Sequence, residues 1–201
     1  MRATLAFLLV AGGARAETVD ALLARLDAQA RTVTTMAGEF TQKNRVKIFK
    51  QEMRQSGRFY LERPRRIRWE YVSPDPSLLI LDGDAATLRT PGAAPQVFDL
   101  KRDAVMRTVF DQLLLWLGGG GLERAKGDYD LAAGGTAEAP SLTLTPKTGS
   151  PIAKAFARIE LSFDRSLSLR RILLREPSGD EKEVEFVKLT RNAKLPKDAF
   201  R

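Results

Sequence analysis

The chain has 201 residues, no cysteine, no histidine, and a formal net charge of +8 from 33 basic and 25 acidic side chains. Without these two residue types, a disulfide framework, a thiolate or imidazole metal site, a cysteine nucleophile and the commonest general base are excluded, and no cofactor is expected. The basic charge suits an anionic membrane surface or an acidic protein; nucleic acid is not an expected partner, because no nucleic-acid-binding motif is recognisable.

The first sixteen residues are predicted to be a signal peptide. Arg2 supplies a positive charge, Ala3 to Val10 is a mostly apolar stretch too short to span a bilayer, and Ala14-Arg15-Ala16 is a small-x-small cleavage pattern. The alternative, an ordinary N-terminal helix of the folded domain, is disfavoured because the apolar stretch has no polar face. We therefore expect export, removal of residues 1–16, and a mature chain that begins at Glu17.

The segment from Asp20 to Arg31 has the period of an amphipathic helix. Leu22, Leu26 and Ala30 recur every four residues, with polar residues between them. This spacing places the three apolar side chains on one helix face, which is expected to be buried.

After this helix the period of the pattern falls to two. Phe40, Phe59 and Trp69 mark three successive predicted strands, in which apolar and charged residues alternate. Such alternation is typical of antiparallel sheet with one apolar and one solvated face. A short apolar strand at 78–81 then ends at the turn pair Asp82-Gly83.

A second helix is predicted from Val105 to Leu117. It has a wide apolar face that includes Phe110, and the glycine run Gly118 to Gly121 ends it. The remaining predicted strands lie near residue 129 and at 87–90, 96–100, 142–145, 157–163, 167–175 and 183–189.

This order of elements predicts an α+β fold in one domain, residues 17–201, because neither a repeat nor a domain linker interrupts it. About eleven one-sided strands are most simply buried in one strongly curved antiparallel sheet, with the helices over its inner face. We therefore expect an incomplete antiparallel β-barrel lidded by helices, with a cavity beneath the lid.

Several of these motifs, in this order, resemble the periplasmic lipoprotein carriers of the LolA family. The matching residues are Phe40-Thr41-Gln42-Lys43, Gly57 to Pro64, Trp69, Pro74, Ile80, Asp82-Gly83 and Leu142 to Lys147. The resemblance implies an unclosed barrel with a hydrophobic cavity for the acyl chains of lipoproteins.

The resemblance also implies a function and partners. The chain is expected to be a monomeric periplasmic chaperone that takes acylated lipoproteins from an inner-membrane exporter to an outer-membrane receptor. The segment Thr87-Leu88-Arg89-Thr90 lacks the aromatic residues that the family carries there. A carrier of another lipid or hydrophobic metabolite on the same fold therefore stays open as the alternative.

The resemblance assigns Arg63 as a lid latch, since the matching family arginine bonds to backbone carbonyls of a lid helix. The simpler interpretation of Arg63 is a solvated arginine at a strand end. The basic run 63–68 is interpreted as facing an acidic partner or lipid headgroups, with a solvated sheet face as an equal alternative. Six apolar residues are predicted to line the cavity, although each alone is better explained as ordinary core: Leu22, Leu26, Phe40, Phe59, Trp69 and Phe110.

Catalysis is not expected. Carboxylates such as Glu70, Asp82 and Asp84 are candidates for an acid–base pair, but their spacing fits a strand and a turn. A sensor or envelope-stress module is a further class, which would need a second domain.

Overall fold

The computed structural model describes residues 17–48, 51–118 and 121–201. The predicted signal peptide lies outside these residues. The chain begins its described part with helix α1 (Val19–Arg31), and a second helix, α2 (Ala104–Gly118), lies in the middle of the chain. Two short 3₁₀ helices, which the sequence did not predict, follow later: η1 (Leu122–Gly127) and η2 (Pro151–Lys154).

Eleven strands form one antiparallel sheet in the order β6-β5-β4-β3-β2-β1-β11-β10-β9-β8-β7. Their bounds are β1 (Thr35–Val46), β2 (Gln51–Glu62), β3 (Arg66–Ser73), β4 (Ser77–Asp82), β5 (Ala85–Arg89), β6 (Gln96–Asp99), β7 (Tyr129–Gly135), β8 (Pro140–Pro146), β9 (Arg158–Phe163), β10 (Leu169–Arg175) and β11 (Glu181–Arg191). The two outer strands, β6 and β7, do not pair with each other, so the sheet stays open. This confirms the predicted α+β half-barrel.

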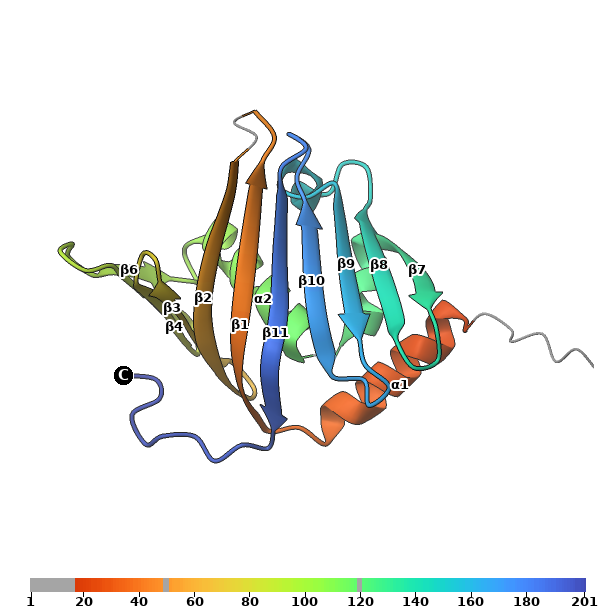
Figure 1. Cartoon of the computed structure of the whole chain (residues 1–201), viewed down its shortest axis with the longest axis horizontal. Coiled ribbons are helices and arrows are strands. Elements are labelled where there is room, and N and C mark those ends of the chain that lie inside the picture. The colour runs from red at the N-terminus through yellow and green to blue at the C-terminus, as the bar shows by residue number, and fades with distance from the viewer. Residues whose placement is uncertain (1–16, 49–50, 119–120) are drawn as a thin grey trace, which may run out of the picture.

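Both helices cover one face of this sheet, which we call the inner face. In Figure 1, α2 lies behind the sheet and α1 runs across the lower ends of the later strands. The hydroxyl of Thr18 caps the start of α1 by accepting a hydrogen bond from the Ala21 amide at 3.2 Å. The apolar face of α1 and the side chains of Phe110 and Trp116 in α2 join the core of the sheet.

Aromatic side chains fill the middle of the inner face. The rings of Phe40 and Trp69 stack with centroids 4.1 Å apart, and Phe59 lies 5.7 Å from Trp69. The stack depends on Gly57, which is opposite Phe40 in the register of β1 and β2. A Cβ atom at Gly57 would lie 2.1 Å from the Glu70 carbonyl oxygen and 2.5 Å from the Phe40 ring.

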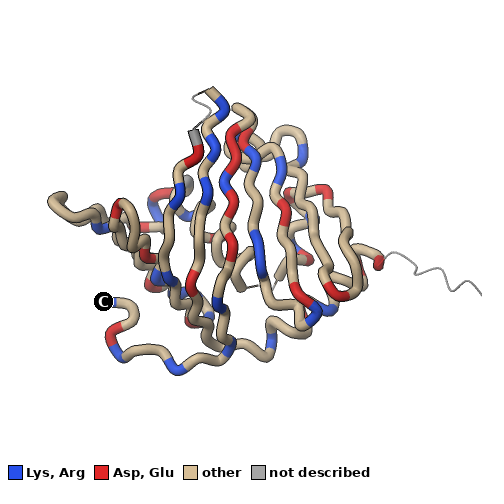
Figure 2. Tube along the Cα trace, viewed as in Figure 1, with Lys and Arg blue, Asp and Glu red and all other residues tan. Residues whose placement is uncertain are grey.

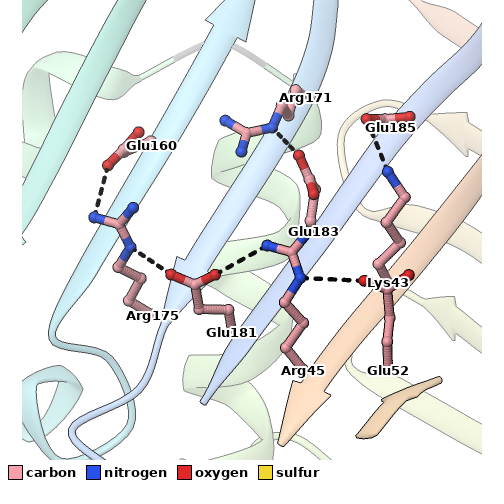
Figure 3. A network of polar contacts seen from close by, with 9 residues as sticks. All are labelled: Lys43, Arg45, Glu52, Glu160, Arg171, Arg175, Glu181, Glu183 and Glu185. Atoms are coloured by element: carbon pink, nitrogen blue, oxygen red, sulfur yellow. Dashed lines mark hydrogen bonds and ion pairs between the residues drawn. The ribbon is translucent and has the colours of Figure 1, made fainter. Parts of the chain in front are cut away.

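The outer face of the sheet carries charged residues of both signs along neighbouring strands (Figure 2). Figure 3 shows the central part, where Arg45 lies 3.2 Å from Glu52 and 3.3 Å from Glu181. Glu181 also pairs with Arg175 at 2.9 Å, and Arg175 reaches Glu160 at 3.3 Å. Exposed pairs of this kind stabilise the fold little, but they keep the face solvated, as the alternating sequence predicted.

We predict that Gly57→Ala lowers the free energy of unfolding by roughly 1–3 kcal/mol, the usual effect of overpacking a close contact. The added methyl group meets the backbone of β3, which cannot rotate away as a flexible side chain can. Urea unfolding followed by circular dichroism measures the change. Gly127→Ala is the matched control, because no atom lies within 4 Å of its Cβ position. Equal unfolding midpoints for both variants would contradict this packing.

Candidate lid and cleft

A cleft of about 970 Å³ opens between the two helices and the turn that joins β2 to β3. Its buried apolar side is formed by Ala30, Leu61, Ala125 and Tyr129. Leucine side chains of α2 and charged side chains from α1, α2, the β2–β3 turn, η1 and its C-cap add to the lining: Asp27, Arg31, Arg63, Arg65, Asp111, Leu114, Leu115, Glu123, Arg124 and Asp128. The cleft is therefore apolar where it is buried and charged where it is open.

Arg63 spans this cleft from the sheet to the lid. It directly follows β2, its backbone amide donates to the Thr34 carbonyl at 2.9 Å, and its Nη2 donates to the carbonyl oxygen of Gly118. Gly118 ends α2, where backbone carbonyls lack helical partners and the helix dipole is negative. A cation at this point satisfies one of these carbonyls and stabilises the helix end.

Arg63 is only partly exposed, which affects its ionisation. Burial lowers the pKa of its guanidinium, and the nearby Asp27 carboxylate opposes this effect. Arginine nevertheless stays protonated in proteins. Its Nε is buried and has no hydrogen-bond partner within the described part of the chain, so Arg63 makes fewer bonds here than its donors allow.

Three further polar contacts tie the lid elements together around the cleft. Arg65 Nη1 lies 2.7 Å from Asp111 Oδ1 and connects the β2–β3 turn to α2. The Gly121 amide donates to Asp27 Oδ1 at 2.9 Å and connects η1 to α1. The Tyr129 hydroxyl donates to Gln112 Oε1 at 2.6 Å, and burial raises the pKa of this tyrosine. The lid is thus closed on this side by a few polar contacts.

The six residues predicted to line a cavity lie in the packed core instead of along this cleft. All are at most 6% exposed, and none belongs to the lining of the 970 Å³ cleft. Leu26 alone borders a second hollow, whose 20 Å³ is about the volume that one water needs. In this closed arrangement the helices themselves occupy the inner face, and the lining role of these residues stays a prediction: Leu22, Leu26, Phe40, Phe59, Trp69 and Phe110.

The basic run 63–68 does not form a free positive patch. Arg65 pairs with Asp111, Arg66 lies 2.7 Å from Glu62 and 3.1 Å from Asp82, and Arg68 lies 3.1 Å from Glu70. The interpretation of this run as a docking face for an acidic partner therefore loses its support, because carboxylates of the sheet and of α2 already pair with these arginines.

The candidate acid–base carboxylates are held in ion pairs. A hydrogen bond from Arg58 lowers the pKa of Glu70, with a further contribution from Arg68. Asp82 pairs with Arg66, and Asp84 lies 3.6 Å from Lys101. A carboxylate with a lowered pKa is a poor general acid at neutral pH. Among the described residues, no group of three or more carboxylates is arranged to hold a metal ion, and no helix is long and apolar enough to cross a membrane.

Sequence reasoning missed the polar groups that join the lid elements. Asp27, Asp111 and Gln112 are ordinary helix-surface residues by pattern, and their partners are distant in the chain. Only Gly118 carried a local signal, since a glycine run predicts a helix end.

Known proteins are similar to this chain in sequence and in fold. A family model described as outer membrane lipoprotein carrier protein LolA matches residues 31–201. The chain belongs to the LolA family. The family assignment confirms the resemblance found in the sequence motifs.

Individual relatives of the family are moderately similar to this chain. Outer-membrane lipoprotein carrier proteins from Methylibium petroleiphilum and Ralstonia nicotianae are each 30% identical, over 203 and 196 residues. These matches cover 97% and 94% of this chain, and 89% and 84% of the two relatives. The homologue from Dechloromonas aromatica is 29% identical over 172 residues, covering 85% of this chain and 78% of its own.

Among solved structures, MucB in complex with MucA(peri) superposes with a TM-score of 0.50 at 17% identity. The match covers 92% of this chain and 59% of the MucB chain. This chain therefore spans less than two thirds of MucB, and the likeness shows a shared fold only.

Proposed function

We propose that this protein is a periplasmic, monomeric chaperone that carries acylated lipoproteins from an inner-membrane exporter to an outer-membrane receptor. It holds the acyl chains between the inner face of the sheet and the helices, and it catalyses no reaction. The observation that carries the proposal is the Arg63–Gly118 contact, which joins sheet to lid across a large cleft in a member of the LolA family.

Entry of an acyl chain requires the lid to move, because the core side chains of α2 rest on the inner face. The Arg63 hydrogen bond opposes opening by roughly 1.5–3 kcal/mol, the usual contribution of a hydrogen bond to a charged group. Burial of a dozen methylene groups contributes about 10 kcal/mol, at about 0.8 kcal/mol each. Acyl burial thus outweighs the latch, and the empty carrier returns to the closed form.

Release follows from relative affinity. The receptor needs to hold the acyl chains more tightly than the carrier by about 1.4 kcal/mol for each tenfold preference. The latch favours release, since closing the lid recovers the Arg63 bond as the acyl chains leave. No covalent step is needed, which agrees with the ion-paired state of the carboxylates Glu70, Asp82 and Asp84.

A carrier for another lipid or hydrophobic metabolite is the second candidate. It is favoured by the charged residues around the mouth of the cleft, among them Arg31 and Arg124, because a polar head group is easily accommodated there. Mass spectrometry of ligand that copurifies with the native protein separates the two candidates.

We predict that the native protein binds a fluorescent apolar probe and that a synthetic triacylated lipopeptide displaces it. Leu115→Asp should weaken probe binding tenfold or more, because a charge at the half-buried cleft wall is costly to desolvate. Val109→Asp, at an exposed position of the same helix, is the matched control and should bind normally. A native protein that takes up neither probe nor lipopeptide would refute the carrier proposal.

We predict that Arg63→Leu leaves the fold intact but impairs delivery to the receptor. Loss of the bond should shift the balance of closed and open lid roughly tenfold to a hundredfold toward open, from the energy above. The variant should accept lipopeptide yet release it slowly in a transfer assay. Arg54→Leu, at an exposed site on β2, is the control. Normal transfer by Arg63→Leu would show that this arginine is no latch.

A further inference from the structure

The segment that follows β11 runs back toward β3. Figure 1 shows it leaving the lower end of β11 and passing along the sheet to the side of β2 and β3. Its first residue is firmly placed: Asn192 Oδ1 accepts from the Thr34 amide at 2.9 Å, and Asn192 Nδ2 donates to the Thr32 carbonyl at 3.0 Å. The far end of the segment contacts the outer face of the sheet.

Two arginines of β3 make these far contacts. Arg68 Nη1 lies 3.5 Å from the Ala199 oxygen and 3.4 Å from the Arg201 oxygen. The guanidinium carbon of Arg66 lies 4.3 Å from the centroid of the Phe200 ring, a cation–π contact. Ala199 is only 4% exposed. Ala199, a small residue, and Phe200, an aromatic residue, thus each have a defined contact with an arginine of β3.

A buried apolar residue lies beside these arginines on the outer face. Ile67 and Trp69 of β3 point into the core, so Arg66 and Arg68 point to the outer face. Ile80 of β4 is opposite Arg68 in the register and therefore lies on the same outer face, yet it is only 6% exposed. Ile80 is thus a buried apolar residue next to Arg68 on an otherwise charged face.

The two guanidinium groups are also held by carboxylates of the sheet, independently of the segment's own contacts. Arg66 is held by Glu62 and Asp82 at 2.7 and 3.1 Å, and Arg68 by Glu70 at 3.1 Å. A site whose groups are fixed in advance loses little freedom when a ligand binds.

The segment itself is held weakly. Both hydrogen bonds from Arg68 are at the long limit for such bonds. The segment nevertheless occupies the site because it is covalently linked to the sheet through Asn192. Such a short tether gives the segment an effective concentration at the site on the order of 1 mM. A peptide from another protein that makes shorter hydrogen bonds can therefore displace it.

We propose that the outer face around Arg66, Arg68 and Ile80 is a peptide-binding site that residues 196–201 occupy in cis. Its ligand is a protein segment with a small residue followed by an aromatic residue, whose backbone carbonyls accept from Arg68. The site is on the face opposite the lid helices, so a partner can dock there whether the cleft is open or closed. This inference does not depend on the cargo of the cleft.

The test uses a fluorescent peptide with the sequence of residues 195–201, measured by anisotropy against the full chain and a chain lacking residues 196–201. If the free peptide binds with a dissociation constant of about 0.1 mM, an effective concentration of about 1 mM makes binding to the full chain roughly tenfold weaker. The full chain with Phe200→Ala should bind the peptide as tightly as the shortened chain does, because its own segment no longer competes. This variant keeps the experiment decisive if removal of residues 196–201 disturbs the fold.

Matched changes define the site. A peptide with Phe200→Ala, or the shortened chain with Arg66→Gln and Arg68→Gln, should lose binding. Arg171→Gln, which removes another ion-paired arginine of the outer face, should leave binding unchanged. Equal binding to full and shortened chains, no binding to either, or binding that does not require Phe200 would each overturn the proposal.

Discussion

An open sheet of eleven strands with one apolar face must bury that face, and this constraint shapes the rest of the molecule. Closing the sheet into a barrel would bury it, but β6 and β7 do not pair. Two helices therefore cover this face, and their side chains Leu22 and Phe110 belong to the same buried core as the aromatic stack of the sheet. Two helices do not cover the whole inner face, and the cleft beside Leu61 remains. At this cleft the lid is held to the sheet and to η1 by the polar contacts of Arg63 and Asp27.

The elements of this fold could be predicted from the sequence because their causes are local. The period of four at Leu22, Leu26 and Ala30 predicted a helix at 20–31, and α1 spans Val19–Arg31. Alternation through Phe40 and Trp69 predicted strands with one buried face, and both residues are buried. The number of strands and the openness of the sheet also agree with the prediction.

The candidate site was harder to predict because its causes are distant in the chain. The partner of Arg63 is 55 positions away, so only the family resemblance pointed to a lid carbonyl. Apolar patterning marks a residue such as Phe59 as buried, but a packed core and a cavity wall look the same in a sequence. The charges of 63–68 look free until the strand register places Asp82 opposite Arg66. Nothing local showed that Phe200 has a place on the outer face.

The two faces of the sheet divide the molecule by chemistry. The inner face is apolar and covered by a lid that weak polar contacts hold, which suits a ligand whose burial is worth more than those contacts. The outer face carries paired charges, and at Arg66 and Arg68 it is contacted by Phe200 and Ala199. In the account proposed here, cargo and partner proteins use separate surfaces, and neither surface needs a catalytic group.

The central claim, that the lid moves to admit acyl chains, is most directly tested by distance measurement between spin labels. Because the chain has no cysteine, labels can be placed at Arg107→Cys on α2 and Arg54→Cys on β2, both exposed positions, with Arg54→Cys and Lys188→Cys as a control pair within the sheet. Bound triacylated lipopeptide should lengthen the α2–β2 distance and leave the control distance unchanged. An unchanged α2–β2 distance with lipopeptide bound at saturation would contradict the account.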